Sequence, residues 1–377
     1  MPTAATMPAT TGGAPAGKQA APRMVVPFVR GSGLHRELID DRTVTLTTVQ
    51  QDIAPIEVNA YGYMRSLYIV VTGTAGGGTA ATLVEDGPFN ALLNLQLLQP
   101  NGFPFYQVSS GYHSYLIDKY GGYAYQQEAK LRDSYVYTAG GGTAPNLSFQ
   151  MRIPVELNIR DALGVLPNKN AAAPFKFKYS LNTLANVFGG TPTTPSLRIQ
   201  IYLEAWDQPP DSLNGQGVQG TPPAMNTIQY WTEQPITVQA GQFNPRFTRM
   251  GNYLRMWIGV LRRTASTRVN GDSDFANPCT LLIDQRNQDY INRSVWRTDV
   301  YEKWGYNGTA DTAGARDSGV YVYDYAHEFD GKVGHENRDL WLPTLEATRY
   351  ELSGSWGNQG VLTVLTNDVA PQGNVFL

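Results

Sequence analysis

Length, composition and charge exclude several classes of protein before any motif is considered. A chain of 377 residues with a net charge of −3 is too long for one ordinary core, so two domains are expected, and it lacks the positive charge of a strongly basic nucleic-acid binder. Its single cysteine, Cys279, excludes an intrachain disulfide and a cysteine-based metal site, and no apolar run approaches the roughly 18 residues of a membrane span.

The first 23 residues are almost entirely Ala, Thr, Pro and Gly. Such a composition buries too little surface to offset the entropy of an ordered chain, so segment 1–23 is expected to be disordered on its own. Two interpretations stay open: a tail without a role, or an arm that becomes ordered against neighbouring subunits. Lys18 and Arg23 are its only basic side chains, which predicts weak charge-driven binding to DNA or lipid head groups.

Strand-like runs follow from residue 24 to residue 206. The most regular alternates apolar and polar side chains from Phe149 to Ile159, which indicates a strand with one buried face. Pro154 removes a backbone donor from this run, so the strand is expected at a sheet edge or with a bulge. Further strands are predicted at 43–49, 66–71, 93–97, 175–179 and 197–205.

A Pro-, Gly- and Gln-rich stretch at 207–226 reads as a linker, and the strand pattern then begins again. The expected organisation is therefore an arm at 1–23, a first domain at 24–206, the linker, and a second domain at 227–377. Helices are too few for a parallel α/β fold. The sequence predicts an all-β protein with a few short helices, built as two tandem eight-stranded antiparallel jelly-roll β-sandwiches.

One local unit occurs twice, at Leu92–Tyr123 and Leu281–Tyr306. Each copy runs from a strand through a helical segment, expected at 110–120 and 290–304, to an acid, a lysine, an aromatic and a glycine before a tyrosine. The glycines stand where a helix C-cap needs a left-handed backbone, and each aromatic is expected to pin its helix end to its own barrel. The proposed structural repeat positions are Tyr120, Gly121, Tyr123, Trp304, Gly305 and Tyr306.

Residues that carry chemistry are sparse. His327 and His335 lie near Glu328, Asp330 and Glu336, but a polar surface loop explains that stretch better than a metal site. His113 is expected to be a packing residue, and Cys279 is expected to be buried as a small apolar side chain. The glycine-rich loops lack the Lys and Ser/Thr of a phosphate-binding loop, so no cofactor is expected.

Two tandem jelly rolls, each with an inserted helix and joined by a Pro-rich linker, resemble the major capsid proteins of tailless icosahedral double-stranded DNA viruses. This lineage includes adenovirus hexon, and its tectivirus-like bacteriophage members are most similar in length. The segment from Ile159 to Pro167, with Leu163-Gly164 and Leu166-Pro167, resembles a connection before a late strand of such domains. Leu342-Pro343 is expected to occupy the matching place in the second half.

The resemblance implies a structural protein with no enzymatic activity. It implies homotrimers of nearly hexagonal outline that tile a virion shell beside neighbouring trimers, with penton and minor capsid or membrane proteins as further partners. In the related viruses the shell encloses a membrane around the genome, and N-terminal arms lie on its inner side. An internal lipid membrane is thus a candidate partner of segment 1–23, assembly is expected in the host cytoplasm, and no sequence-specific nucleic acid is expected.

Two other classes of function stay open. The aromatic content, 11% of residues, would also suit a carbohydrate-binding or glycoside-cleaving β-sandwich, because Trp and Tyr stack on sugars. Against this, the aromatics recur on predicted strands and in both helical units, where core packing explains them. A trimeric phage receptor-binding protein is the third alternative, since such proteins are also rich in strands.

Overall fold

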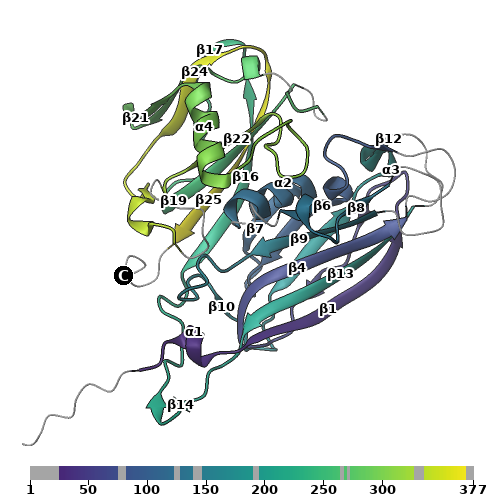
Figure 1. The fold of residues 1–377 in the computed structure, drawn as a ribbon, viewed down its shortest axis with the longest axis vertical. Helices are drawn as coiled ribbons and strands as arrows, with labels where there is room; N and C mark the ends of the chain where they lie inside the picture. The colour runs from purple at the N-terminus through teal and green to yellow at the C-terminus, as the bar shows by residue number, and fades with distance from the viewer. Residues whose placement is uncertain are drawn as a thin grey trace, which may run out of the picture.

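The computed structural model describes residues 25–74, 82–122, 128–138, 147–189, 195–263, 267–269, 272–326 and 335–370. The segment 1–23 and the residues Tyr123, His327, Glu328 and Asp330, all discussed above, lie outside these ranges. The described chain consists mainly of antiparallel strands, with short helices between them (Figure 1). The all-β prediction is confirmed.

The first half contains two main sheets and the short pair β5-β12. One has the order β1-β13-β4-β9-β8, with β10 paired to β4, and the other begins β2-β11-β6-β7, with β3 paired to β11. The bounds of the first sheet are β1 Leu34–Thr45, β13 Ser196–Trp206, β4 Tyr63–Thr74, β9 Leu147–Pro154, β8 Val136–Tyr137 and β10 Leu166–Pro167. Those of the second are β2 Gln51–Asp52, β3 Ile56–Glu57, β11 Lys176–Leu181, β6 Leu92–Leu98 and β7 Pro104–Ser110.

The second half repeats this arrangement. One set of strands has the order β16-β25-β19-β22, with β23 paired to β19, and the other has the order β17-β24-β20-β21, with β18 paired to β24. The bounds of the first set are β16 Ile228–Val238, β25 Gly360–Ala370, β19 Tyr253–Arg262, β22 Val320–Asp324 and β23 Leu342–Pro343. Those of the second are β17 Gly241–Phe243, β18 Arg246–Phe247, β24 Tyr350–Trp356, β20 Cys279–Ile283 and β21 Arg286–Ile291.

The two halves share one strand order. If the eight main strands of each half are numbered along the chain, the strand order in one sheet is first, eighth, third and sixth. In the other sheet it is second, seventh, fourth and fifth. This is the order of a jelly roll, a sandwich of two sheets built from Greek keys. In both halves a helix lies between the fifth and sixth strands. The tandem jelly-roll prediction is therefore confirmed.

The remaining elements are short and connect the sheets. In the first half they are α1 Phe28–Gly31, β5 Thr82–Leu83, η1 Phe89–Ala91, α2 Gly111–Leu116, the π-helix η2 Ile117–Gly121, η4 Ala129–Leu131, α3 Leu184–Val187 and β12 Phe188–Gly189. In the link and the second half they are β14 Ser212–Leu213, β15 Gln216–Gly217, η5 Asp272–Asp274, α4 Arg293–Trp304 and η6 Arg338–Leu340.

The two Leu-Pro segments take equivalent places, as expected. Leu166 pairs with Met64 at the start of β4, and Leu342 pairs with Leu254 at the start of β19. Gly164 precedes the first segment with a φ of +86°, a left-handed conformation that suits glycine. Pro154 ends β9, whose outer neighbour β8 reaches only Leu147 and Ser148, so the prediction of an edge position is also confirmed.

Four local expectations need correction. The strand expected from Phe149 to Ile159 ends at Pro154, and the helix expected at 290–304 begins only at Arg293, because Tyr290 and Ile291 belong to β21. The first strand begins at Leu34, not at Thr43, because its first residues lie at the sheet edge with an exposed outer face and lack the apolar alternation of an inner strand. Gly121 is not a left-handed cap, because α2 continues through it as a π-helix and the turn closes at Gly122 with a φ of −88°. Gly305 does end α4 in the left-handed region, with a φ of 67°.

Candidate assembly site

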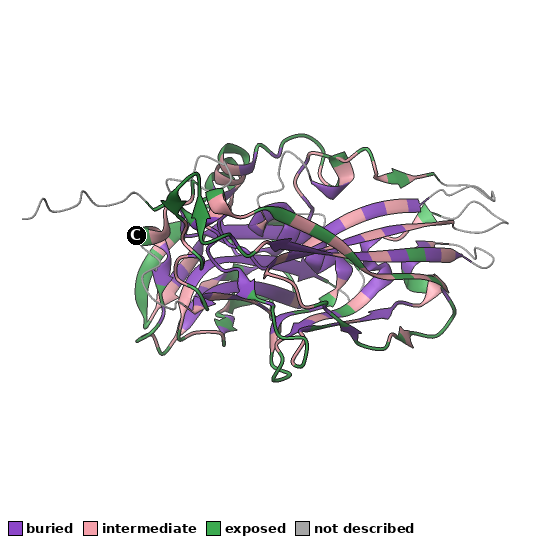
Figure 2. Cartoon of the chain, turned by 90° about the horizontal axis from the view of Figure 1, so that it is seen from below, coloured by how far each residue is buried: buried purple, intermediate pink, exposed green. Residues whose placement is uncertain are grey.

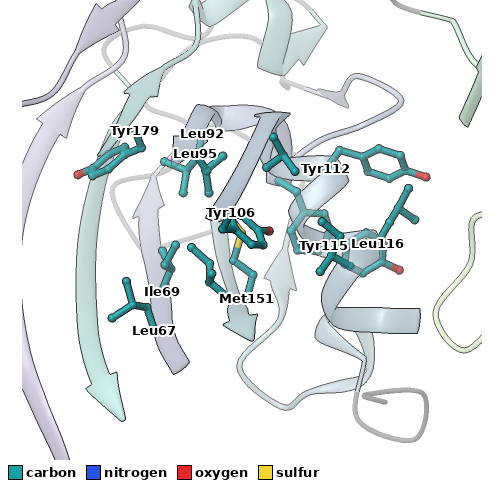
Figure 3. Packing of buried hydrophobic residues seen from close by; sticks show 14 of the residues in the cluster. Leu67, Ile69, Leu92, Leu95, Tyr106, Tyr112, Tyr115, Leu116, Met151 and Tyr179 are labelled. Carbon is teal, nitrogen blue, oxygen red and sulfur yellow. The ribbon is translucent and has the colours of Figure 1, made fainter. Parts of the chain in front are cut away.

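The helix α2 lies between the two jelly rolls. Ser110 begins it, because its side-chain oxygen accepts a hydrogen bond from the Tyr112 N–H, and all six helical residues are buried. Figure 3 shows Tyr115 and Leu116 of α2 close to Tyr106 and Met151 of the first half. The same apolar cluster includes residues from the second half: Trp231, Met256, Ile258, Val260, Val320, Val322 and Leu365. One apolar core therefore crosses the boundary between the halves.

A backbone contact joins the two halves beside this helix. The edge strand β7 of the first half pairs in parallel with β16 of the second at Tyr106 and Trp231, which makes one continuous sheet of ten strands. Gly121 allows this approach, because a Cβ there would overlap the Trp231 ring. The need for glycine at 121 is thus steric, and it arises from the other half of the chain.

The predicted repeat residues meet one another at this junction. The Tyr120 ring lies 5.6 Å from the Trp304 ring and 5.4 Å from the Tyr306 ring, both edge to face. Trp304 and Tyr306 are buried in the cluster that includes the first-half core. The expectation that each aromatic pins its helix to its own barrel is therefore wrong, because the two helix ends pack on each other.

A buried lysine joins the two halves by ion pairs. Lys119 Nζ lies 2.8 Å from Asp317 Oδ2 of the second half and 2.8 Å from Glu128 Oε2 of the first. It also donates to the Ala315 carbonyl at 2.6 Å. Burial would raise the pKa of the Asp317 carboxyl, but the charges of Lys119 and Lys130 hold that pKa below its usual value.

A second repeat, which sequence reasoning missed, includes an arginine that links the two halves. Arg255 pairs with Glu336 and donates to the Gly121 carbonyl across the junction at 3.0 Å, and in the first half Arg65 pairs with Glu156. Both arginines stand third in a matching tripeptide at the start of the third main strand, Tyr63-Met64-Arg65 and Tyr253-Leu254-Arg255. The signal for this repeat was therefore present in the sequence.

A groove of about 660 Å³ opens beside α2, between the halves. In its wall, Glu233 accepts from the Ser109 N–H and hydroxyl, both at 2.7 Å, and lies 3.0 Å from His113 Nδ1. Burial would raise the pKa of Glu233, but its electrostatic interaction and hydrogen bond with His113, and the two Ser109 donors, lower that pKa to about 2. Three buried atoms in the groove lack a hydrogen-bond partner among the described residues: Asn90 Oδ1, His113 Nε2 and Arg262 Nη1.

The residues that could take part in catalysis or metal binding do not lie together in one site. His35 stacks on Tyr61, His113 pairs with Glu233, and Cys279 is buried, which raises the pKa of its thiol to about 12. Glu336 pairs with Arg255, and its neighbours at 327–334 lie outside the described residues. Within the described ranges, no group of three or more His, Cys, Asp or Glu is arranged to hold a metal. No helix in those ranges has the length and apolarity needed to cross a membrane.

No family model and no curated protein sequence matches this chain. Solved structures share its fold. It is similar to the MCP of STIV, with a TM-score of 0.60 and 14% identity over 90% of this chain and 97% of that one. It is also similar to the PBCV-1 capsid model, with a TM-score of 0.54 and 10% identity over 90% and 94%, and to the Faustovirus major capsid protein, with a TM-score of 0.51 and 9% identity over 90% of both chains. At these identities the likeness establishes the double jelly-roll fold.

Proposed function

We propose that this chain is the major capsid protein of an icosahedral virus, a structural protein without enzymatic activity. The supporting observation is that two jelly rolls of one strand order are fixed side by side by a shared core and a shared sheet. Such a pair is a rigid two-barrel block. The three similar structures named above are capsid proteins, which agrees with this role.

The assembly we propose is a homotrimer. Three two-barrel chains present six similar barrels, so a closed ring has a nearly hexagonal outline and can contact neighbouring trimers on six sides. Closed symmetric assembly of this kind is typical of soluble homo-oligomers. On this proposal the protein is found in the virion shell, beside penton and minor capsid or membrane proteins.

The proposed division of the chain follows the strands. The first jelly roll comprises 24–206, the link 207–226 and the second 227–377; the nearest strand ends are Trp206 of β13 and Ile228 of β16. We further propose that segment 1–23 is an arm on the inner side of the shell, where an internal lipid membrane around the genome is its candidate neighbour. Assembly in the host cytoplasm belongs to the same proposal.

Native mass spectrometry of the purified chain tests this function. We expect three times the chain mass of 41.5 kDa, without any requirement for divalent metal or sugar. A glycan array run on the same sample tests the carbohydrate-binding alternative. A monomer that binds glycans would overturn the capsid proposal and favour a sandwich lectin.

A further inference from the structure

One buried group of side chains is arranged for a reaction as well as for holding the two jelly rolls together. Lys119, Glu128 and Asp317 are each at most 1% exposed, and Figure 2 shows buried residues along the middle of the molecule. Lys119 belongs to the π-helix η2 of the first half, Glu128 precedes η4, and Asp317 precedes β22 of the second half. Two carboxyl groups therefore meet one amine away from water.

Aromatic rings enclose this amine. Lys119 Nζ lies 4.2 Å from the centroid of the Tyr306 ring. Tyr115 and Tyr120 contribute two further rings, whose centroids are 5.6 and 5.5 Å from Nζ. All three tyrosines are buried. Such an enclosure excludes the water that would hydrate the charges or hydrolyse an amide, so it favours the loss of water between the acid and the amine.

The carboxyl group of Asp317 is positioned as an electrophile. Its Oδ2 lies 2.8 Å from Lys119 Nζ and accepts from the Tyr120 hydroxyl at 3.3 Å. Its Oδ1 accepts from the Tyr112 hydroxyl at 3.2 Å, and Lys130 Nζ lies 4.0 Å from the same oxygen. Donors and a cation in these places stabilise the negative charge that develops on a carboxyl oxygen when an amine attacks the carboxyl carbon.

The carboxylate of Glu128 is positioned as a proton acceptor. Its Oε1 accepts from the Gly314 N–H at 2.9 Å, which fixes the group. Its Oε2 lies 2.8 Å from Lys119 Nζ, yet it accepts no hydrogen bond from the described residues. An oxygen with free lone pairs at this distance can take a proton from the amine as the amine reacts.

We propose that Lys119 and Asp317 form an isopeptide bond, an amide between their side chains, with Glu128 as the catalytic proton carrier. The Lys119 ammonium first gives a proton to Asp317 Oδ2 across their contact. The neutral amine attacks Asp317 Cγ, and Glu128 takes a proton from the nitrogen and passes it to the departing hydroxyl. The Nζ–Cγ bond forms, the Cγ–Oδ2 bond breaks, and one water leaves. Glu128 ends as a carboxylate, and no electrons are gained or lost.

The bond joins the two jelly rolls covalently across 198 residues of chain. It replaces a buried ion pair, whose charges are costly to keep out of water, by a neutral amide. The N–H that remains on Nζ can still donate to the Ala315 carbonyl, 2.6 Å away. Because the reaction occurs once on its own chain, without turnover, the protein stays a structural one.

The equivalent lysine of the second half provides an internal comparison. Lys303 Nζ lies 2.9 Å from Asp324 Oδ1, but the Lys303 side chain is 17% exposed, and the pair lines a cavity of about 100 Å³. In the described part of the chain, Asp324 is the one carboxylate that pairs with Lys303. The same residue types at a similar distance thus lack the second carboxylate and the enclosure, so no bond is expected there.

The mass of the folded, purified chain, measured after denaturation, tests the bond. We expect the mass to fall short of that of the sequence by one water molecule. Trypsin should then fail to cut after Lys119 and leave it joined to the peptide 317–332, while it cuts normally after Lys303. Fragmentation should place the link at Asp317 and not at Asp324. A folded wild-type chain with the full mass of its sequence would overturn the proposal.

Glu128→Gln tests the proton carrier. Glutamine keeps an oxygen for the Gly314 N–H and leaves Lys119 and Asp317 in place, so this variant should fold and retain the full mass of its sequence. Glu57→Gln is the matched control, because Glu57 belongs to an exposed ion pair, and it should lack one water as the wild type does. If folded Glu128→Gln also lacks the water, the role of Glu128 is wrong.

Cleavage between the halves gives a second reading. A protease site inserted between Asn214 and Gly215 lies in the exposed stretch 211–217. After cleavage, the two halves of the otherwise wild-type chain should stay together on a denaturing gel, and those of Glu128→Gln should separate. Separation in both chains would contradict the bond. It would leave the capsid proposal intact, because assembly depends on the folded two-barrel block and is tested by the oligomeric mass.

Discussion

Tyr120 and Trp304 stand 184 residues apart in equivalent helix ends, and their rings meet edge to face at 5.6 Å with an interplanar angle of 85°. Both side chains are buried at the boundary between the jelly rolls. The contact makes the stability of each half depend on the other. It also explains why an aromatic is needed before the glycine in both copies, since each ring packs on its counterpart.

Trp304→Ala is therefore expected to destabilise the whole chain. Truncation of a buried aromatic costs about 3–5 kcal/mol. Tyr120→Ala should have an effect of similar kind, and the double variant should fall short of the sum by about 0.5–1.5 kcal/mol, the range of an aromatic pair. Chemical denaturation of the four proteins measures this coupling. Strict additivity would show that the two rings do not stabilise each other.

Lys119→Met is expected to destabilise the protein more than the similar volumes of the lysine and methionine side chains suggest. It leaves Asp317 and Glu128 buried without their shared cation, and removal of one partner from a buried pair costs about 3–5 kcal/mol. Lys176→Met is the matched control, because Lys176 and Glu57 form an exposed pair that contributes about 0–1 kcal/mol. Equal denaturation midpoints for the two variants would contradict the role given to Lys119.

The two repeat glycines should respond differently to substitution. Gly121→Ala places a methyl group in the Trp231 ring, so it should disturb the junction and lower the melting temperature markedly. At Gly305 the space around a Cβ is open and only the left-handed backbone opposes it, which costs roughly 1–2 kcal/mol. Gly305→Asn should cost less than Gly305→Ala, since asparagine tolerates this conformation. Equal losses for Gly121→Ala and Gly305→Ala would contradict the steric account.

Acid should weaken the junction through Glu233. Its folded pKa, about 2, is below its usual value of 4.5, so the carboxylate contributes stability above pH 4.5 and loses it as the pH falls from 4.5 towards 2. The contribution is at most roughly 3 kcal/mol. Glu233→Gln should lower stability at neutral pH and flatten the profile in this window. If Glu233→Gln loses as much stability in acid as the wild-type protein does, other carboxyl groups cause the acid sensitivity.

The sequence contained enough information for the fold class and the two jelly rolls, but not for their strand order or for the junction between them. The alternation from Phe149 to Pro154 and the Leu-Pro segments reflect local pairing, so they could be read directly, although the same alternation continues to Ile159, beyond the end of β9. The role of Gly121 could not be read from the sequence, because it depends on the contact with Trp231 of the other half. The matched tripeptides with Arg65 and Arg255 are also visible in the sequence, but they lie outside the two strand-helix units on which the predicted repeat rests.

The groove beside α2 could not be predicted from the sequence either. Its walls come from segments far apart in the chain, including Asn90, Glu233 and Arg262. No local pattern brings these three together, because their proximity depends on the docking of one jelly roll on the other. Sequence reasoning expected His113 to be a satisfied packing residue. It is buried, but its partner Glu233 is 120 residues away and its Nε2 lacks a hydrogen-bond partner among the described residues.

An electron-microscopy reconstruction of the purified oligomer tests the central claim most directly. The account predicts a threefold particle with six barrel-shaped densities in a nearly hexagonal outline. A particle with only twofold symmetry, or a threefold particle without six such densities, would contradict it.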